Sequence, residues 1–89
     1  ISGEAARQVG ILLKELSQQH QVITITHLPQ IAAKATAHFY VYKQQEKKRI
    51  STKIRLLSYD EKIETIARML SGEQLTESSL KTAMELVIG

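Results

Sequence analysis

The histidine at position 27 lies between an apolar run and a proline. Residues 22–26 read Val-Ile-Thr-Ile-Thr, and Leu28, Pro29 and Gln30 follow the histidine. A short apolar, β-branched run is typical of a parallel strand that is covered on both faces, and Pro29 cannot extend it. Because ligands of open α/β sheets bind beyond the carboxyl ends of the strands, His27 is the leading catalytic candidate. The alternative is a strand-end histidine that only satisfies a hydrogen bond.

A second candidate is the cationic cluster Lys47-Lys48-Arg49, which ends the charged stretch 44–49. Lysine and arginine side chains in such a cluster can contact phosphate groups. The alternative is a charged turn that keeps a hairpin soluble and prevents its edges from pairing with other chains.

Several catalytic motifs are absent from the printed sequence. It has no GxxxxGK[ST] phosphate loop, no GxGxxG, no HExxH and no cysteine. The three histidines are 7 and 11 residues apart on different expected elements, so no metal site is predicted. The sequence by itself contains no complete active site that we can name.

The length and charge of the chain limit its class. Its 89 residues form at most one small domain, and its net charge of +3 is compatible with a nucleic-acid partner. No apolar run approaches the roughly 20 residues that span a bilayer, and no signal peptide is recognisable, so no membrane partner is expected. The first residue is Ile and not Met, which suggests a piece of a longer protein.

The first part of the chain predicts half of a βαβ unit. Apolar spacing indicates a helix over residues 4–18, which Ser2 can cap and in which Gly10 would allow close packing on a sheet. The buried parallel strand 22–26 follows, and a short helix is expected over residues 31–35. The strand that should precede the helix over residues 4–18 is missing from the chain.

The second part predicts a hairpin followed by two helices. Strands are expected at residues 38–43 and 50–57, on either side of the charged turn 44–49. In the second strand, alternation puts Ile50, Thr52, Ile54 and Leu56 on one face and Ser51, Lys53 and Arg55 on the other. Ser58 and Glu61 form a capping box, and the helix behind it ends at Gly72. Thr76 or Ser78 begins the last helix. The expected inner faces of these helices comprise Ile63, Ile66, Ala67, Met69 and Leu70, and then Leu80, Ala83, Met84 and Val87. The fold class predicted is α/β.

Three stretches of the sequence resemble the RecN family of bacterial DNA repair ATPases, which are relatives of the SMC proteins within the ABC ATPase superfamily. Residues 26–32, Thr-His-Leu-Pro-Gln-Ile-Ala, resemble the switch-histidine segment of the family. Residues 1–3, Ile-Ser-Gly, resemble the end of its D-loop. Residues 63–72 resemble its near-terminal helix, with Ser71 where glycine is usual. The resemblance covers essentially the whole chain in order.

The resemblance implies that residues 1–89 are the C-terminal part of an ATPase head with a P-loop NTPase-like fold. The phosphate loop, signature motif, Walker B acids and coiled coil would lie upstream. His27 would face the γ-phosphate, with Thr26 and Gln30 as supporting residues, and Ser2 and Gly3 would lie near the interface with a second head. ATP and Mg²⁺ would bind the parent protein, whereas the isolated chain would bind neither and would not hydrolyse ATP.

The implied function is DNA double-strand break repair and recombination, with ATP-driven dimerisation of two heads and engagement of DNA. The implied partners are the rest of the same head, a second identical head and DNA, in the cytoplasm at the nucleoid. The alternative function is a small basic module that binds nucleic acid or protein without catalysis. An open strand edge and the apolar face of the first helix also predict self-association of the isolated chain.

Overall fold

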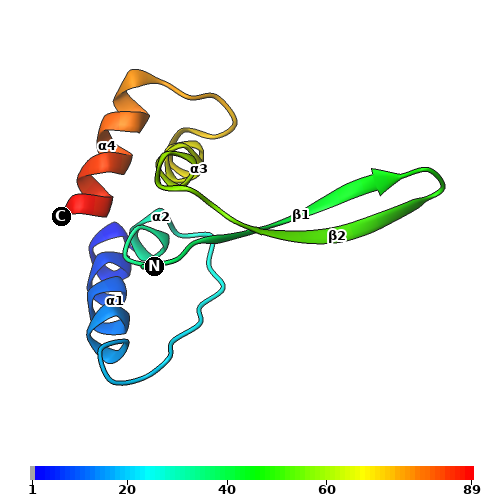
Figure 1. Ribbon diagram of the computed structural model, residues 1–89. Coiled ribbons are helices and arrows are strands. Elements are labelled where there is room, and N and C mark those ends of the chain that lie inside the picture. Colours follow the sequence, from blue (N-terminus) through cyan, green and yellow to red (C-terminus); the bar gives the residue numbers. More distant parts are fainter. Residues whose placement is uncertain (1) are drawn as a thin grey trace.

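The computed structural model describes residues 2–89, in which a small helical body carries a projecting two-stranded hairpin (Figure 1). The elements, in chain order, are α1 (Gly3–Leu16), α2 (Pro29–Ala32), β1 (Phe39–Glu46), β2 (Arg49–Leu56), α3 (Tyr59–Ser71) and α4 (Glu77–Ile88). The predicted mixture of helices with an antiparallel hairpin is confirmed. Within residues 2–89, no helix is long and apolar enough to cross a membrane.

The core lies where α2, α3 and α4 meet. Its buried residues are Ala32, Ala33, Ile63, Ile66, Ala67 and Ala83. Four of these six are alanines, which let the helices approach closely but bury little apolar surface each. The predicted inner faces of the two last helices are therefore confirmed at their centres. At their edges they are not, because Leu70 and Met84 remain 36% and 45% exposed.

Local capping signals place the starts of the three long helices. The Ser2 hydroxyl accepts a hydrogen bond from the Ala5 backbone N–H at 3.1 Å, so α1 begins at Gly3. The predicted capping box between Ser58 and Glu61 is present, with both hydrogen bonds formed. Thr76, one of the two expected starts, caps α4.

The hairpin has the predicted strand faces but a tighter turn. Val41 pairs with Ile54 on one face, and Tyr42 pairs with Lys53 on the other. The prediction of a six-residue turn over 44–49 is wrong. β1 continues to Glu46 and β2 begins at Arg49, so only two residues form the turn. Among the described elements, neither strand packs along a helix, which agrees with the projecting arm in Figure 1.

The buried parallel strand predicted for residues 22–26 is not formed. Residues 21–28 are irregular, and Ile23 and Ile25 are 83% and 100% exposed. A strand needs a neighbour to satisfy its backbone groups, and within residues 2–89 the two strands present pair only with each other. β-branched composition alone does not supply that neighbour, because β-propensity depends on context.

The expected short helix over 31–35 forms two residues earlier, as α2, with Pro29 at its first position. It also provides the contact that explains Gly10, which was expected to pack on a sheet. A Cβ atom at Gly10 would lie 3.0 Å from the Gln30 backbone oxygen, so the glycine packs α1 against α2. The rest of the predicted apolar face of α1 is largely open, with Leu12 and Leu16 55% and 46% exposed.

Candidate functional site

The candidate site is the loop that carries His27 into α2. The Thr26 hydroxyl accepts a hydrogen bond from the Leu28 backbone N–H at 2.9 Å, which forms a local turn around His27. Leu28 is the N-cap of α2, and its carbonyl accepts from the Ala32 N–H at 3.0 Å. These bonds fix the backbone on both sides of His27, while its imidazole is exposed. Thr26, which was predicted to support His27, therefore lies in the turn next to it, and its role in catalysis stays a prediction.

Two other predicted site residues lie beside the same loop. A Cβ atom at Gly3 would be 3.3 Å from the Gln30 side-chain nitrogen, so the Gln30 amide lies against the first turn of α1. Ser2 caps that turn. The structure therefore brings Ser2 and Gly3 next to Gln30, which is three residues along the chain from His27. Ile1, which belongs to the D-loop resemblance, lies outside the described residues.

A balanced ion pair occupies the surface next to this end of α1. The Arg7 guanidinium donates to the Glu4 carboxylate at 3.1 Å, and the Gln8 amide donates to it at 3.0 Å. The hydrogen bond from Arg7, followed by that from Gln8, lowers the pKa of Glu4 below its usual value. Glu4 therefore stays ionised and paired, and it does not place a free negative charge beside Gly3 and Gln30.

Two lysines attach the α2 segment to the helical body. The Lys34 ammonium donates to the Leu86 carbonyl at 3.3 Å, and the Lys62 ammonium donates to the Ala35 carbonyl at 2.6 Å. Burial, with a smaller contribution from Lys14, lowers the pKa of Lys62. The end of α2 is therefore attached to both α3 and α4.

His38 is a residue of interest that the sequence did not indicate. It lies between α2 and β1, and its buried Nδ1 atom has no hydrogen-bond partner within residues 2–89. Burial, and then the positive charge of Lys62, lowers the pKa of His38. Both effects disfavour the charged form of the imidazole in the folded chain. A histidine at the start of an aromatic strand gives no sequence signal of this partial burial.

The cationic cluster is remote from the His27 loop. Lys47 and Lys48 form the β1–β2 turn and Arg49 begins β2, at the end of the arm farthest from α2 (Figure 1). With Glu46 they line a shallow hollow. His27 and the cationic cluster therefore belong to two separate surfaces, and they cannot act on one small ligand.

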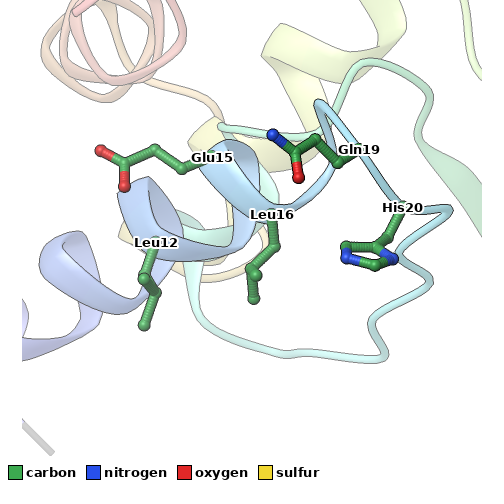
Figure 2. A pocket seen from close by; sticks show the side chains of 5 residues that line it. All are labelled: Leu12, Glu15, Leu16, Gln19 and His20. Atoms are coloured by element: carbon green, nitrogen blue, oxygen red, sulfur yellow. The ribbon is translucent and has the colours of Figure 1, made fainter.

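A further hollow, of about 200 Å³, lies at the end of α1 (Figure 2). Its lining comprises Leu12, Glu15, Leu16, Gln19 and His20. None of the predicted site residues contributes to it. Among residues 2–89, no group of three or more His, Cys, Asp or Glu side chains is arranged to hold a metal ion.

Comparison with known proteins places these observations in a family. No protein-family model matches the chain. DNA repair protein RecN of Rickettsia conorii is 47% identical over 87 residues, which are 98% of this chain and 16% of that protein. RecN of Deinococcus radiodurans is 47% identical over 89 residues, or 100% of the chain and 16% of that protein. RecN of Vibrio cholerae is 41% identical over 88 residues, or 99% of the chain and 16% of that protein.

The chain thus spans about one-sixth of the length of the curated relatives that it matches. This coverage is consistent with a C-terminal segment of such a protein. These alignments cover nearly the whole chain at 41–47% identity, in three different bacteria. They confirm the resemblance that residues 26–32 and 63–72 indicated. The chain belongs to the RecN family of DNA repair proteins.

Proposed function

We propose that the chain is the C-terminal part of an ATPase head in a RecN-type DNA repair protein, and that His27 acts on the γ-phosphate of ATP. The head would have the P-loop NTPase-like fold of ABC and SMC ATPases. The observation that carries the proposal is the 47% identity to RecN proteins over 98% of the chain. The exposed His27, held between the Thr26 turn and α2, supports it.

The chemistry of the proposed role follows from phosphoryl transfer. As the γ-phosphoryl group leaves, negative charge spreads over its equatorial oxygens. An imidazole N–H can donate a hydrogen bond to one of these oxygens or to the attacking water, which stabilises the charge and orients the nucleophile. The turn at Thr26 and the start of α2 at Pro29 would hold the backbone of His27 in place, which limits the reorganisation needed to direct its side chain at the phosphate.

The remaining groups of an ATPase site would come from the rest of the protein. The chain has no phosphate loop, and residues 2–89 hold no cluster of side chains suited to Mg²⁺. The side chains that hold Mg²⁺ would therefore come from the rest of the protein, and the isolated chain is not expected to hydrolyse ATP. Ser2, Gly3 and Gln30 form a polar patch at the start of α1, which would lie near a second, identical head.

The uncovered apolar surfaces fit burial against the rest of the same head. Ile23 and Ile25 are almost fully exposed, and Val41 and Ile54 on the hairpin are 61% and 67% exposed. Surfaces of this kind are uncommon on a finished monomer and mark contact sites. The complete protein would engage DNA in double-strand break repair and recombination, in the cytoplasm at the nucleoid.

The proposed role of His27 is tested in the full-length protein with His27→Ala and, as a matched control, His20→Ala. Both histidines are exposed and lie in irregular segments after α1. Single-turnover ATP hydrolysis and ATP affinity are measured for each. We expect His27→Ala to slow hydrolysis by about 10²–10³-fold, the usual effect of removing one transition-state hydrogen-bond donor, with ATP affinity nearly unchanged.

The control variant should hydrolyse ATP at the wild-type rate. If His27→Ala also hydrolyses and binds ATP like wild type, His27 is a structural residue and the proposed mechanism is wrong. If it loses ATP affinity and hydrolysis in proportion, the residue contributes to ground-state binding and not to the transition state.

A further inference from the structure

The positive charge of the chain is concentrated in the hairpin. Residues 39–56 contain six of the twelve Lys and Arg residues but one of the nine Asp and Glu residues, for a formal charge of +5. The remaining residues contain six cationic and eight acidic side chains, for a formal charge of −2. The arm is thus strongly basic, whereas the helical body is mildly acidic.

The cations nearest the end of the arm are the unpaired ones. Lys53 pairs with Glu46 at 3.1 Å, and Arg55 pairs with Glu61 at 2.6 Å. Within residues 2–89, no ion pair is formed by Lys47, Lys48 or Arg49. Unpaired cations on an exposed turn retain their full attraction for an external anion.

The face of the hairpin changes character along its length. Near the base, the residues on one face are apolar: Phe39, Val41, Ile54 and Leu56. Farther out, the same face carries Lys43 opposite Thr52, and the turn carries Lys47 and Lys48. An apolar base suits contact with protein, whereas a cationic end suits a polyanion. Ile50, 67% exposed, is the apolar exception near the turn.

The first turn residue, Lys47, has a backbone conformation that other residue types adopt at a lower cost in free energy. Lys47 has φ of 48°, in the left-handed region that glycine, asparagine and aspartate tolerate best. A lysine in that conformation costs about 1 kcal/mol or more. Backbone strain kept at an exposed position is a reason to look for a function of the side chain.

We propose that the end of the hairpin, Lys47, Lys48 and Arg49 with Lys43, binds the phosphate backbone of duplex DNA. A two-stranded β-ribbon is narrow enough to follow or enter the major groove, which is about 12 Å wide. Contacts from lysine and arginine side chains to phosphates supply affinity without reading the sequence. The choice of DNA over other polyanions rests on the DNA repair family of the chain, whereas the contact residues are inferred from the hairpin itself.

The test is the salt dependence of DNA binding by the full-length protein. Binding of a fluorescent duplex of about 30 base pairs is measured by anisotropy over a range of KCl concentrations without nucleotide. The hairpin variant is Lys47→Asn, Lys48→Gln and Arg49→Thr, because asparagine tolerates the left-handed turn position and threonine favours a strand. The matched control is Lys14→Gln, Arg68→Gln and Lys81→Gln, which removes the same charge from exposed sites on the helices.

Each lost phosphate contact should reduce the slope of log K against log salt by about 0.9. The magnitude of the slope should therefore be smaller by about 2–3 in the hairpin variant, and its affinity for DNA at least tenfold lower at low salt. The control should keep nearly the wild-type slope. Arg49→Thr alone lies outside the turn and should reduce the slope by about 1, so the proposal is testable even if the triple variant does not fold.

Equal losses in the hairpin variant and the control would overturn the proposal, because the effect would then be one of net charge. Unchanged DNA binding by the hairpin variant would overturn it too. So would a variant that binds DNA like wild type but has lost binding to anionic lipid vesicles, tested in parallel. The titration needs no ATP turnover. Its outcome is therefore independent of the role proposed for His27.

Discussion

The contact between α1 and α2 at Gly10 leads to a prediction whose sign depends on packing. Gly10→Ala adds a methyl group 3.0 Å from the Gln30 backbone oxygen and 3.2 Å from Cγ of Lys34. In a helix interior, alanine is favoured over glycine by about 1 kcal/mol. The substitution therefore stabilises the chain if α2 can move away, and destabilises it if α2 is held in place.

The structure indicates that α2 is held in place. Ala32 and Ala33 at its end are 7% and 2% exposed within the core, and Lys34 donates to Leu86 of α4. Overpacking of this kind costs about 1–3 kcal/mol. Taking about 2 kcal/mol for the clash and about 1 kcal/mol for the gain in helix propensity leaves a net destabilisation of about 1 kcal/mol. For a domain of this size, the unfolding midpoint should fall by about 4–8 °C.

The assay is thermal and urea unfolding of the 89-residue chain at one fixed protein concentration, since association would shift the midpoint. Gly3→Ala is the control, because its nearest neighbour is the flexible end of the Gln30 side chain at 3.3 Å. That variant should change stability by less than about 0.5 kcal/mol, as is usual for surface substitutions. A Gly10→Ala variant that is more stable than wild type would refute the tight packing of α1 on α2.

Two further predictions concern His38 and the uncovered apolar surface. Because burial and Lys62 lower the pKa of His38 in the folded chain, the unfolded chain binds more protons, and stability should fall as the pH drops below about 6.5. The unfolding midpoint should therefore fall more between pH 7.5 and 5.5 in wild type than in His38→Gln; equal falls would contradict this. Because Ile23 and Ile25 are 83% and 100% exposed, the isolated chain should self-associate in light scattering, and Ile23→Lys with Ile25→Lys should weaken this. A monodisperse wild-type monomer at high concentration would show the reasoning to be wrong.

The features that could be predicted from the sequence are those determined by neighbouring residues. The caps at Ser2, Ser58 and Thr76 were predictable because each hydrogen bond closes within three residues. Gly72, with φ of 82°, ends α3 for a similarly local reason. The hairpin faces followed from the alternation of apolar and polar side chains between residues 50 and 57.

The features that could not be predicted depend on distant partners. Residues 22–26 have the composition of a buried strand, but a strand also needs a neighbour, which composition does not provide. The partner of Gly10 and the burial of His38 Nδ1 likewise arise from packing between separate elements. For the candidate site, Thr26 and Gln30 were placed near His27 by sequence proximity, whereas the approach of Gln30 to Gly3 required the packing of α1 on α2. The roles of these residues in catalysis stay predictions.

The carboxylate of Glu61 connects the base of the hairpin to the start of α3. It accepts the Ser58 backbone N–H at 3.0 Å through one oxygen and the Arg55 guanidinium at 2.6 Å through the other, and both bonds lower the pKa of Glu61. From Arg55 in this joint to Arg49 at the start of β2 the arm spans six residue steps, roughly 20 Å. A rotation of about 5° at the joint therefore displaces the far turn by about 2 Å over that length. The length of the hairpin would thus amplify a small tilt of α3 into a larger displacement of Lys47 and Lys48. A displacement of that size is enough to make or break a contact between a lysine and a phosphate.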